Sequence, residues 1–156
     1  MNTTHLNIIS KRVQARQCGA AVVEFALLLI LLLIIVAGVV EFGRTFWYYD
    51  ALTKATRDGA RFLSNARESS TVAINASHID MAKTMVANAA TLAQVPGFNS
   101  GQVTVTCDTA CGANPTYITV SIGYPVTIGS WIPFVTLVGA PWDATLSPYT
   151  TMRYMR

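Results

Sequence analysis

The sequence predicts an α+β fold with a long N-terminal helix, transmembrane and then amphipathic, a second helix and a small antiparallel sheet. Three observations predict it. An almost wholly apolar run extends from Ala20 to Val40. Apolar residues then recur with the 3.6-residue period of a helix up to about Ser64 and again over 78–93, and from Gln102 onward they alternate with polar residues, as in half-buried strands. Helices followed by strands, rather than alternating with them, are typical of α+β folds.

The apolar run has the length of one transmembrane helix. Its 21 residues correspond to about 31 Å of helix, which matches a hydrocarbon core of about 30 Å. Lys11, Arg12 and Arg16 precede the run, with no acidic residue before it. Because basic residues stay on the cytoplasmic side, the sequence predicts a cytoplasmic N-terminus and an exported C-terminal part.

The charge balance argues against a nucleic-acid-binding protein. The net charge is +3, and three of the eleven Lys and Arg residues precede Gly19. The remainder carries eight basic and eight acidic residues, so it is neutral. A nucleic-acid surface needs clustered basic side chains, and here the excess lies in the leader. The 116 residues after Val40 are enough for one modest domain.

The segment before the apolar run resembles the recognition sequence of a prepilin peptidase. A secretory signal would be cleaved after its apolar region, where Val36-Ala37-Gly38 fits poorly. A lipoprotein cysteine would also follow the run, whereas Cys18 precedes it. Basic residues, then Gly19, then an apolar segment whose fifth residue is Glu24 fit cleavage between Gly19 and Ala20.

Glu24 is the informative residue of the apolar run. An acidic residue at the centre of a membrane helix costs about 2.5–3.5 kcal/mol, and less near the interface. In one interpretation, cleavage creates a cationic amine on Ala20 that pairs with Glu24 of a neighbouring helix and sets the register between subunits. In the other, Glu24 lies within about one turn of the interface and extends its carboxylate into water. The spacing from Gly19 favours the first interpretation.

Arg16-Gln-Cys-Gly-Ala-Ala-Val-Val-Glu-Phe25 and Glu41-Phe-Gly-Arg44 together resemble the N-terminal signature of TadE-like proteins, pilin-like components of the Flp (tight adherence) pilus of bacteria. The resemblance extends over residues 16–63, and Thr151-Met-Arg153 is similar to the family's C-terminal strand. It implies a pilin-like architecture, processing at Gly19 and Ala20 by a prepilin peptidase, and roles for Glu24 and Phe25 in subunit register and assembly.

The resemblance also implies an organisation and a set of partners. Residues 1–19 are expected to be a cytoplasmic leader, 20–43 a single transmembrane helix of the bacterial inner membrane, and 44–156 a periplasmic domain. The protein would be a structural pseudopilin that supports pilus biogenesis and tight adherence. Its partners would be the peptidase, other pilin-like subunits, inner-membrane assembly proteins and the lipid bilayer, and it would form homo- or hetero-oligomers in a filament. The alternative is an unprocessed single-pass protein whose periplasmic domain binds partners in a secretion apparatus.

Residues just beyond the apolar run are predicted to lie at the membrane interface. Phe46 to Tyr49, which include Trp47 and Tyr48, form an aromatic belt. Glu41 and Arg44 are spaced for an ion pair. No proline interrupts the chain before Ser64, so one helix is expected to continue outward, with charges on one face and an apolar stripe on the other. Either the protein's own sheet or a neighbouring subunit is expected to cover that stripe, the former more for its distal half. The members of the charged face are Asp50, Lys54, Arg57, Asp58 and Arg61, with Asp50/Lys54 and Lys54/Asp58 as pairs, and those of the stripe are Tyr48, Leu52, Ala55, Gly59 and Phe62.

The remaining elements follow from periodicity. A loop over 65–77 precedes a helix over 78–93, which Ser77 is expected to cap with Asp80 in the first turn. Two strands follow, at 102–107 and 118–122, with Tyr124 to Ile128 as an extension of the second past Pro125. Residues 129–143 are predicted to be an apolar loop, which either closes the core or binds a partner. The last segment, 144–156, is expected to be a strand broken at Pro148.

Cys107 comes just before the loop over 108–116 between the two strands, Cys111 lies within it, and the two are predicted to form a disulfide, because the exported side of a membrane permits oxidation. Their spacing, with no second pair of ligands nearby, fits neither zinc nor a dithiol oxidoreductase. The exported part has one histidine, His78, and no phosphate loop or nucleophile motif. The sequence therefore predicts a protein that is not an enzyme and uses no cofactor or metal.

Overall fold

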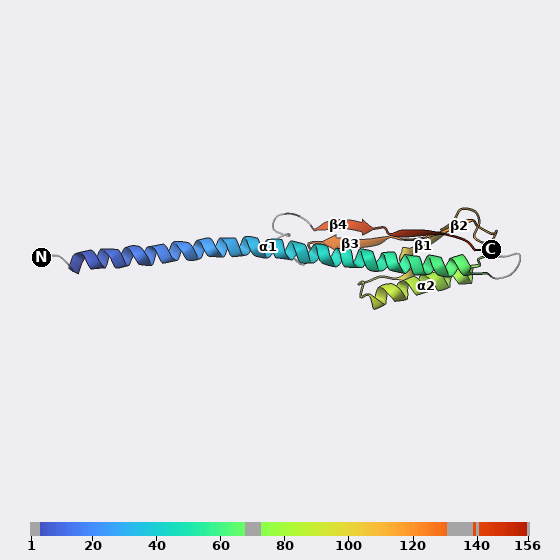
Figure 1. Ribbon diagram of the computed structural model, residues 1–156, viewed down its shortest axis with the longest axis horizontal. Helices are drawn as coiled ribbons and strands as arrows, with labels where there is room; N and C mark the ends of the chain where they lie inside the picture. Colours follow the sequence, from blue (N-terminus) through green and yellow to red (C-terminus); the bar gives the residue numbers. More distant parts are fainter. Residues whose placement is uncertain (1–3, 68–72, 131–138, 140, 156) are drawn as a thin grey trace. The chain divides into compact units, whose positions relative to one another are not determined.

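The computed structural model describes residues 4–67, 73–130, 139 and 141–155, and over 4–18 it describes only the helical backbone. The predicted leader side chains, with Cys18, and Trp131, Pro133 and Phe134 therefore lie outside the described residues. The elements in chain order are α1 (Thr4–Asn65), α2 (Ala76–Leu92), the 3-10 turn η1 (Ser100–Gln102), β1 (Val103–Cys107), β2 (Tyr117–Ile122), β3 (Tyr124–Ile128), β4 (Trp142–Leu146) and β5 (Tyr149–Arg153) (Figure 1). The α+β prediction is confirmed.

The chain divides into two compact units, Met1–Val40 and Glu41–Arg156. In the first, the described residues form part of α1, which contains no break between the apolar run and Asn65. This confirms that one helix continues past the apolar run to at least Ser64. No proline and no run of turn residues lies within the helix, so nothing in the sequence ends it earlier.

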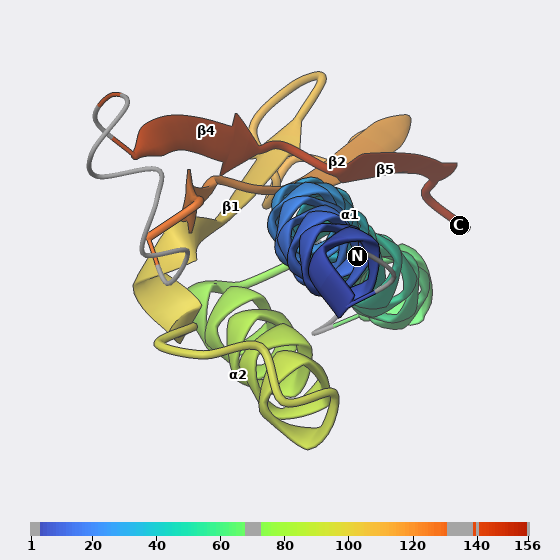
Figure 2. The same ribbon diagram turned by 90° about the vertical axis from the view of Figure 1, so that its left-hand side faces the viewer.

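The second unit has one hydrophobic core between α1, α2 and the strands. The strands lie on one side of the 41–65 segment of α1, and α2 lies on another (Figures 1 and 2). The predicted apolar stripe faces this core, since Leu52, Ala55 and Gly59 are buried. The protein's own domain therefore covers the stripe. Other buried members of the core are Ala60, Leu63, Ala82, Val86, Ala90, Val103, Ile118, Val120 and Ile122.

Polar contacts tie the distal part of α1 to the C-terminal strand. The Thr56 hydroxyl is fully buried, donates to the Thr53 carbonyl at 2.8 Å, and lies 3.0 Å from the Thr150 hydroxyl on β5. After β5, the Tyr154 hydroxyl donates to the Ala66 carbonyl, and the Met155 N–H donates to the Ser64 carbonyl. These bonds satisfy carbonyls at the end of α1 that have no partner within the helix.

The first sheet is antiparallel, in the order β1-β2-β5. β1 pairs with β2 from Val103↔Ile122 to Cys107↔Ile118, so the two strands and the connection predicted from the alternating pattern are confirmed. In β2 the residues Ile118, Val120 and Ile122 are buried, and the residues between them are more exposed. The period of two therefore presents one face of this strand to the helices.

The prediction that Tyr124 to Ile128 extend the second strand was wrong. These residues form β3, which pairs with β4 in a separate two-stranded sheet. The break falls at Gly123, whose N–H bonds to the Gln102 carbonyl. Trp142, assigned from the sequence to the apolar loop, begins β4. The predicted break at Pro148 is confirmed, and the strands before and after it belong to different sheets.

The predicted cap of the second helix was also wrong. α2 begins at Ala76, and Asn75 caps it, with its Oδ1 accepting from the His78 N–H at 2.9 Å. The His78 Nδ1 in turn lies 3.5 Å from the Asn75 N–H, which completes a capping box. Ser77 lies inside the helix, and Asp80 lies beyond its first turn. Asparagine is as good an N-cap as serine, so the earlier residue takes the position.

Candidate functional site

The predicted processing residues lie on an exposed part of α1. Gly19, Ala20, Glu24 and Phe25 are all helical and exposed, and Phe25 exposes 65% of its surface. Around the Cβ position of Gly19 no other atom lies within 4 Å, apart from its chain neighbours and the backbone of its own helix turn. Among the residues whose side chains the structure describes, Gly19 and Ala20 are therefore exposed on this helix.

The apolar part of α1 has no protein cover. Among the described residues, the helix over Gly19–Asn65 is the one that is long and apolar enough to cross a membrane, and none of its most apolar stretch is buried. Large side chains are exposed on every side of it, as the consecutive residues Leu27 to Ile30 illustrate, because they point in four directions around the helix. A helix that is apolar all round needs lipid or other helices around it.

The residues predicted to lie at the membrane interface are at the start of the second unit, Glu41–Arg156. Glu41 is 2% exposed, and both of its carboxylate oxygens accept from the Arg44 side chain, at 2.9 and 3.0 Å. Its Oε1 also accepts from the Gly129 N–H at 3.2 Å. Sequence spacing predicts the Arg44 pair but carries no signal for Gly129, which is 88 positions away. Glu41 therefore joins α1 to the residue that follows β3.

The predicted aromatic belt separates into outward and inward members. Phe46 and Trp47 expose 63% and 62% of their surfaces, while the Trp47 Nε1 donates to the Ala93 carbonyl at 3.3 Å. Tyr48 instead packs against the core and meets Tyr124 edge to face, with 6.4 Å between ring centroids. Desolvation by burial, together with Tyr48, raises the pKa of the Tyr124 hydroxyl, which donates to the Pro96 carbonyl.

Cys107 and Cys111 form a disulfide in the structure, with an S–S distance of 2.06 Å. The bridged loop also holds a second segment of chain, because the carbonyls of Cys111 and Gly112 accept from the N–H groups of Ile74 and Ala73. This contact joins the β1–β2 connection to the residues just before α2.

Asp108 organises the same loop. Its Oδ1 accepts backbone N–H bonds from Thr109, Thr116 and Tyr117 at 3.0, 2.9 and 3.2 Å. Desolvation acts to raise the pKa of this carboxyl, but the bonds from these backbone N–H groups outweigh it, so the pKa lies below its ordinary value.

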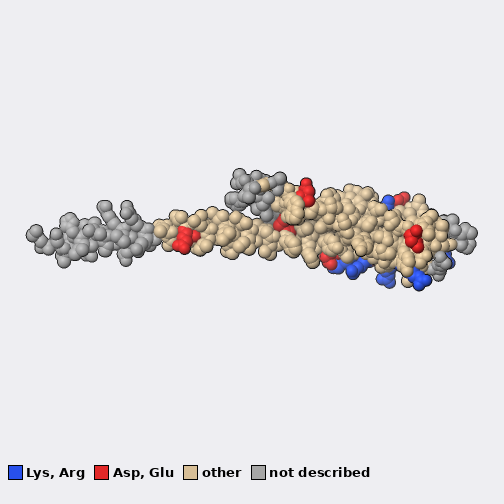
Figure 3. All heavy atoms as spheres, turned by 90° about the horizontal axis from the view of Figure 1, so that it is seen from above, with Lys and Arg blue, Asp and Glu red and all other residues tan. Residues whose placement is uncertain are grey.

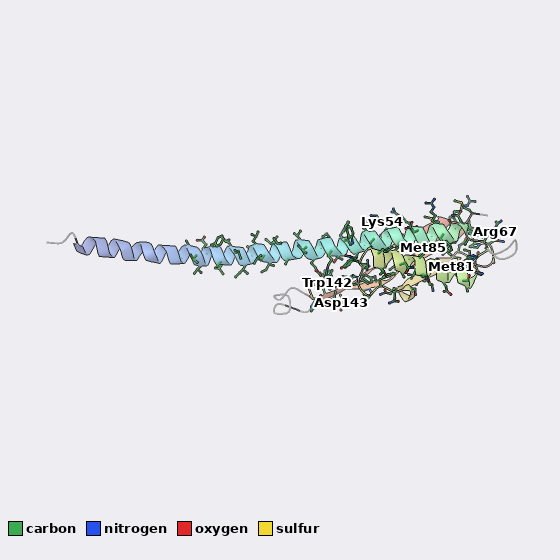
Figure 4. All side chains as sticks on the ribbon, turned by 90° about the horizontal axis from the view of Figure 1, so that it is seen from below. Lys54, Arg67, Met81, Met85, Trp142 and Asp143 are labelled. Atoms are coloured by element: carbon green, nitrogen blue, oxygen red, sulfur yellow. A yellow bond between two sulfur atoms is a disulfide. The ribbon has the colours of Figure 1, made fainter. Side chains whose placement is uncertain are left out.

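A groove lies between the distal end of α1 and α2. It has a volume of about 740 Å³, and Phe62, Met81 and Met85 form its apolar wall, with Asp58 and Arg61 at its edge. Figure 4 shows Met81 and Met85 side by side on α2. The sequence analysis did not predict this groove, in which Met81 exposes 56% of its surface.

Of the two predicted pairs on the charged face, only Asp50 with Lys54 forms within the described residues, at 2.6 Å between the charged atoms. Figure 3 shows that Lys and Arg side chains gather along one edge of the second unit. No group of three or more potential metal-ligating residues occurs in the described part of the chain. His78 takes part in the cap of α2 and packs against Phe62.

Comparison with known proteins gives one match. No curated protein and no solved structure matches the chain. Residues 19–61 match the family of TadE-like proteins, and this confirms, over that segment of α1, the resemblance that the sequence shows.

Proposed function

We propose that this chain is a pilin-like subunit of the Flp (tight adherence) pilus machinery, anchored in the inner membrane and processed between Gly19 and Ala20. The family match over 19–61 carries the proposal, since it indicates a pilus-associated protein. The match begins at the glycine at which we place cleavage, and Glu24 lies five positions further on. The leader before Gly19 and the periplasmic location of residues 44–156 are parts of the same proposal.

The exposure of α1 supports assembly as the purpose of this helix. The 41–65 segment buries its apolar stripe in its own domain, so that stripe is not available to another subunit. Within the described part of the chain, residues 20–40 remain largely exposed, and apart from Glu24 they are apolar on every side. We infer that residues 20–40 lie in lipid before assembly and contact the same segment of other pilin-like subunits afterwards. An amine on Ala20, created by cleavage, would then pair with Glu24 of a neighbour.

A second candidate is an unprocessed single-pass protein whose outer unit binds another component of a secretion apparatus. The groove beside α2 favours it, because Met81 and Met85 line this groove and are exposed, and a membrane anchor alone does not need such a surface. Methionine-rich surfaces are common at adaptable binding sites. The two candidates differ in whether the chain is cleaved.

The test is the intact mass of the membrane-extracted protein from cells with and without the cognate prepilin peptidase. We expect an N-terminus at Ala20 only where the peptidase is present. Gly19→Leu should keep the full-length mass in both strains, because a large side chain obstructs the small pocket expected at a cleavage site. Gly38→Leu, on the same helix, is the matched control and should be cleaved normally. A full-length wild-type chain in both strains would favour the second candidate.

A further inference from the structure

Trp142 is an exposed tryptophan at a defined level of the second unit. It begins β4, exposes 74% of its surface, and is the partner of Ile128 in the pairing of β3 with β4. The next residue after Ile128 is Gly129, whose N–H reaches the buried Glu41 carboxylate at 3.2 Å. The tip of this sheet is therefore fixed beside the start of the 41–65 segment of α1.

The direction of β3 supports this level. At its other end, Tyr124 contacts Tyr48, which lies seven residues, or about 10 Å, further along α1 than Glu41. β3 thus runs antiparallel to the 41–65 segment of α1, toward Glu41. Figure 4 agrees, since it places Trp142 and Asp143 near one end of this unit and Arg67 and Met81 toward the other.

Other exposed aromatic residues lie near the start of the 41–65 segment of α1, as Trp142 does. Phe42 and Phe46 are exposed and stack on one another, with ring centroids 6.3 Å apart, and Trp47 follows on the same helix. Glu41 directly follows the last apolar residue of the membrane-spanning run. Tryptophan and other aromatic residues favour the interfacial region of a bilayer, where an apolar ring lies beside a polar headgroup.

We propose that the Trp142 end of the β3–β4 sheet rests on the outer face of the membrane, as a second lipid contact beside the aromatic residues of α1. The inference rests on the membrane anchoring in the proposed function. It deepens that proposal, because a helix and a sheet tip held together by Glu41 and Gly129 would fix the outer unit against the bilayer at two points rather than one.

The charges at this level predict how the contact depends on lipid. Arg44 is paired with Glu41, and the Asp143 carboxylate accepts from the Thr127 hydroxyl at 2.8 Å. The exposed cations Lys54, Arg57 and Arg61 lie further along α1. The contact is therefore mainly apolar and aromatic, and because the hydrogen-bonded Asp143 carboxylate keeps its negative charge, we expect anionic lipid not to strengthen it.

The experiment uses the full chain reconstituted in phosphatidylcholine vesicles that carry brominated acyl chains, which quench nearby tryptophan fluorescence. The chain has three tryptophans. The double variant Trp47→Phe with Trp131→Phe has Trp142 as its single tryptophan. The double variant Trp131→Phe with Trp142→Phe has Trp47 as its single tryptophan. Met81→Trp, with all three native tryptophans replaced by Phe, supplies a matched exposed probe far from the tip.

We expect Trp142 to be quenched to an extent comparable with Trp47 and several times more than the Met81→Trp probe. Adding phosphatidylglycerol should not change this order. If Trp47 is quenched and Trp142 behaves like the Met81→Trp probe, the inference is overturned while anchoring stands. If Trp142 is shielded from aqueous iodide but not quenched by brominated lipid, another protein copy covers it, and the inference is again overturned. If Trp47 is not quenched either and alkaline carbonate removes the chain from the vesicles, the anchoring in the proposed function itself fails.

Discussion

The Cβ position of Gly59 on α1 lies 2.7 Å from Cγ2 of Val86 on α2. Real Cβ atoms do not approach other atoms so closely, and Val86 is fully buried, so its methyl group has little room to move. A glycine is therefore required here by the distance between the two helices, at a position where a helix would otherwise favour alanine.

We expect Gly59→Ala to destabilise the second unit by about 1–3 kcal/mol, because overpacking outweighs the gain in helix propensity. Gly43→Ala is the control. Its Cβ position is open, so the same change should be neutral or stabilising by up to about 1 kcal/mol. Urea unfolding of the full chain in detergent, followed by near-ultraviolet circular dichroism, measures both values. A Gly59→Ala variant as stable as Gly43→Ala would show that α1 and α2 move apart to admit the methyl group without loss of stability.

Glu41→Gln should destabilise the second unit by about 1–3 kcal/mol. Glutamine keeps an acceptor for the Gly129 N–H but loses the charge that binds Arg44, and the site is buried. The cost stays below that of a fully buried ion pair because the Arg44 side chain is 42% exposed. Asp50→Asn is the control, since its pair with Lys54 is largely exposed and contributes at most about 0.5 kcal/mol. Equal unfolding midpoints for the two variants would contradict the role assigned to Glu41.

The contrast between Gly59 and Glu41 shows what the sequence predicts and what it does not. The apolar stripe and the Glu41–Arg44 pair are local, because both follow from the helical period. The Gly59–Val86 contact and the Glu41–Gly129 bond join residues far apart in the chain, and no local pattern carries them. Asn75 offered a local signal that was missed: asparagine followed three residues later by His78 is a capping box with an unusual last member.

The strands show the same limit. Alternation predicts β1 and β2, but the sheet to which a strand belongs depends on where the chain turns. Gly123 separates β2 from β3, and its bond to Gln102 is visible only in the folded chain. Trp142 was assigned to a loop because the residues before it have no period, although pairing with Ile128 places it in β4. A strand that begins with two exposed residues gives no alternating signal at its start.

Asp108 should make stability depend on acid pH. Its pKa in the folded protein is lowered below the ordinary 3.8, so the carboxylate stabilises the fold above that value, and the contribution is lost as pH falls through the folded-state pKa. The melting temperature of wild type should therefore fall more steeply below pH 3.8 than that of Asp108→Asn. Asp80→Asn, at an exposed residue of α2, is the control. Parallel melting curves for wild type and Asp108→Asn would contradict this role.

Cys107→Ser should destabilise the second unit by about 2 kcal/mol, which is the loop-closure free energy expected for a disulfide that bridges so few residues. Since the Cys111 and Gly112 carbonyls hold Ile74 and Ala73, the loss should also increase hydrogen exchange at these two N–H groups. Cys18→Ser changes the other cysteine and should leave both measurements unchanged. Unchanged exchange in Cys107→Ser would show that the loop keeps its place without the bridge.

Glu24→Gln tests the proposed register between subunits. The side chain keeps its size and loses its charge, so membrane insertion should be unaffected or easier, and the mature N-terminus should still be Ala20. Assembly should fail, because a loss of about 1.4 kcal/mol lowers an association constant tenfold, and the contact recurs at each subunit. Glu24→Asp keeps the charge and should retain part of the assembly. The measurement is the amount of sheared surface pili per cell beside the intact mass of the membrane-bound chain. Normal piliation by a correctly processed Glu24→Gln chain would mean that this carboxylate does not set the register, and the cost of keeping it in the membrane would then need another cause.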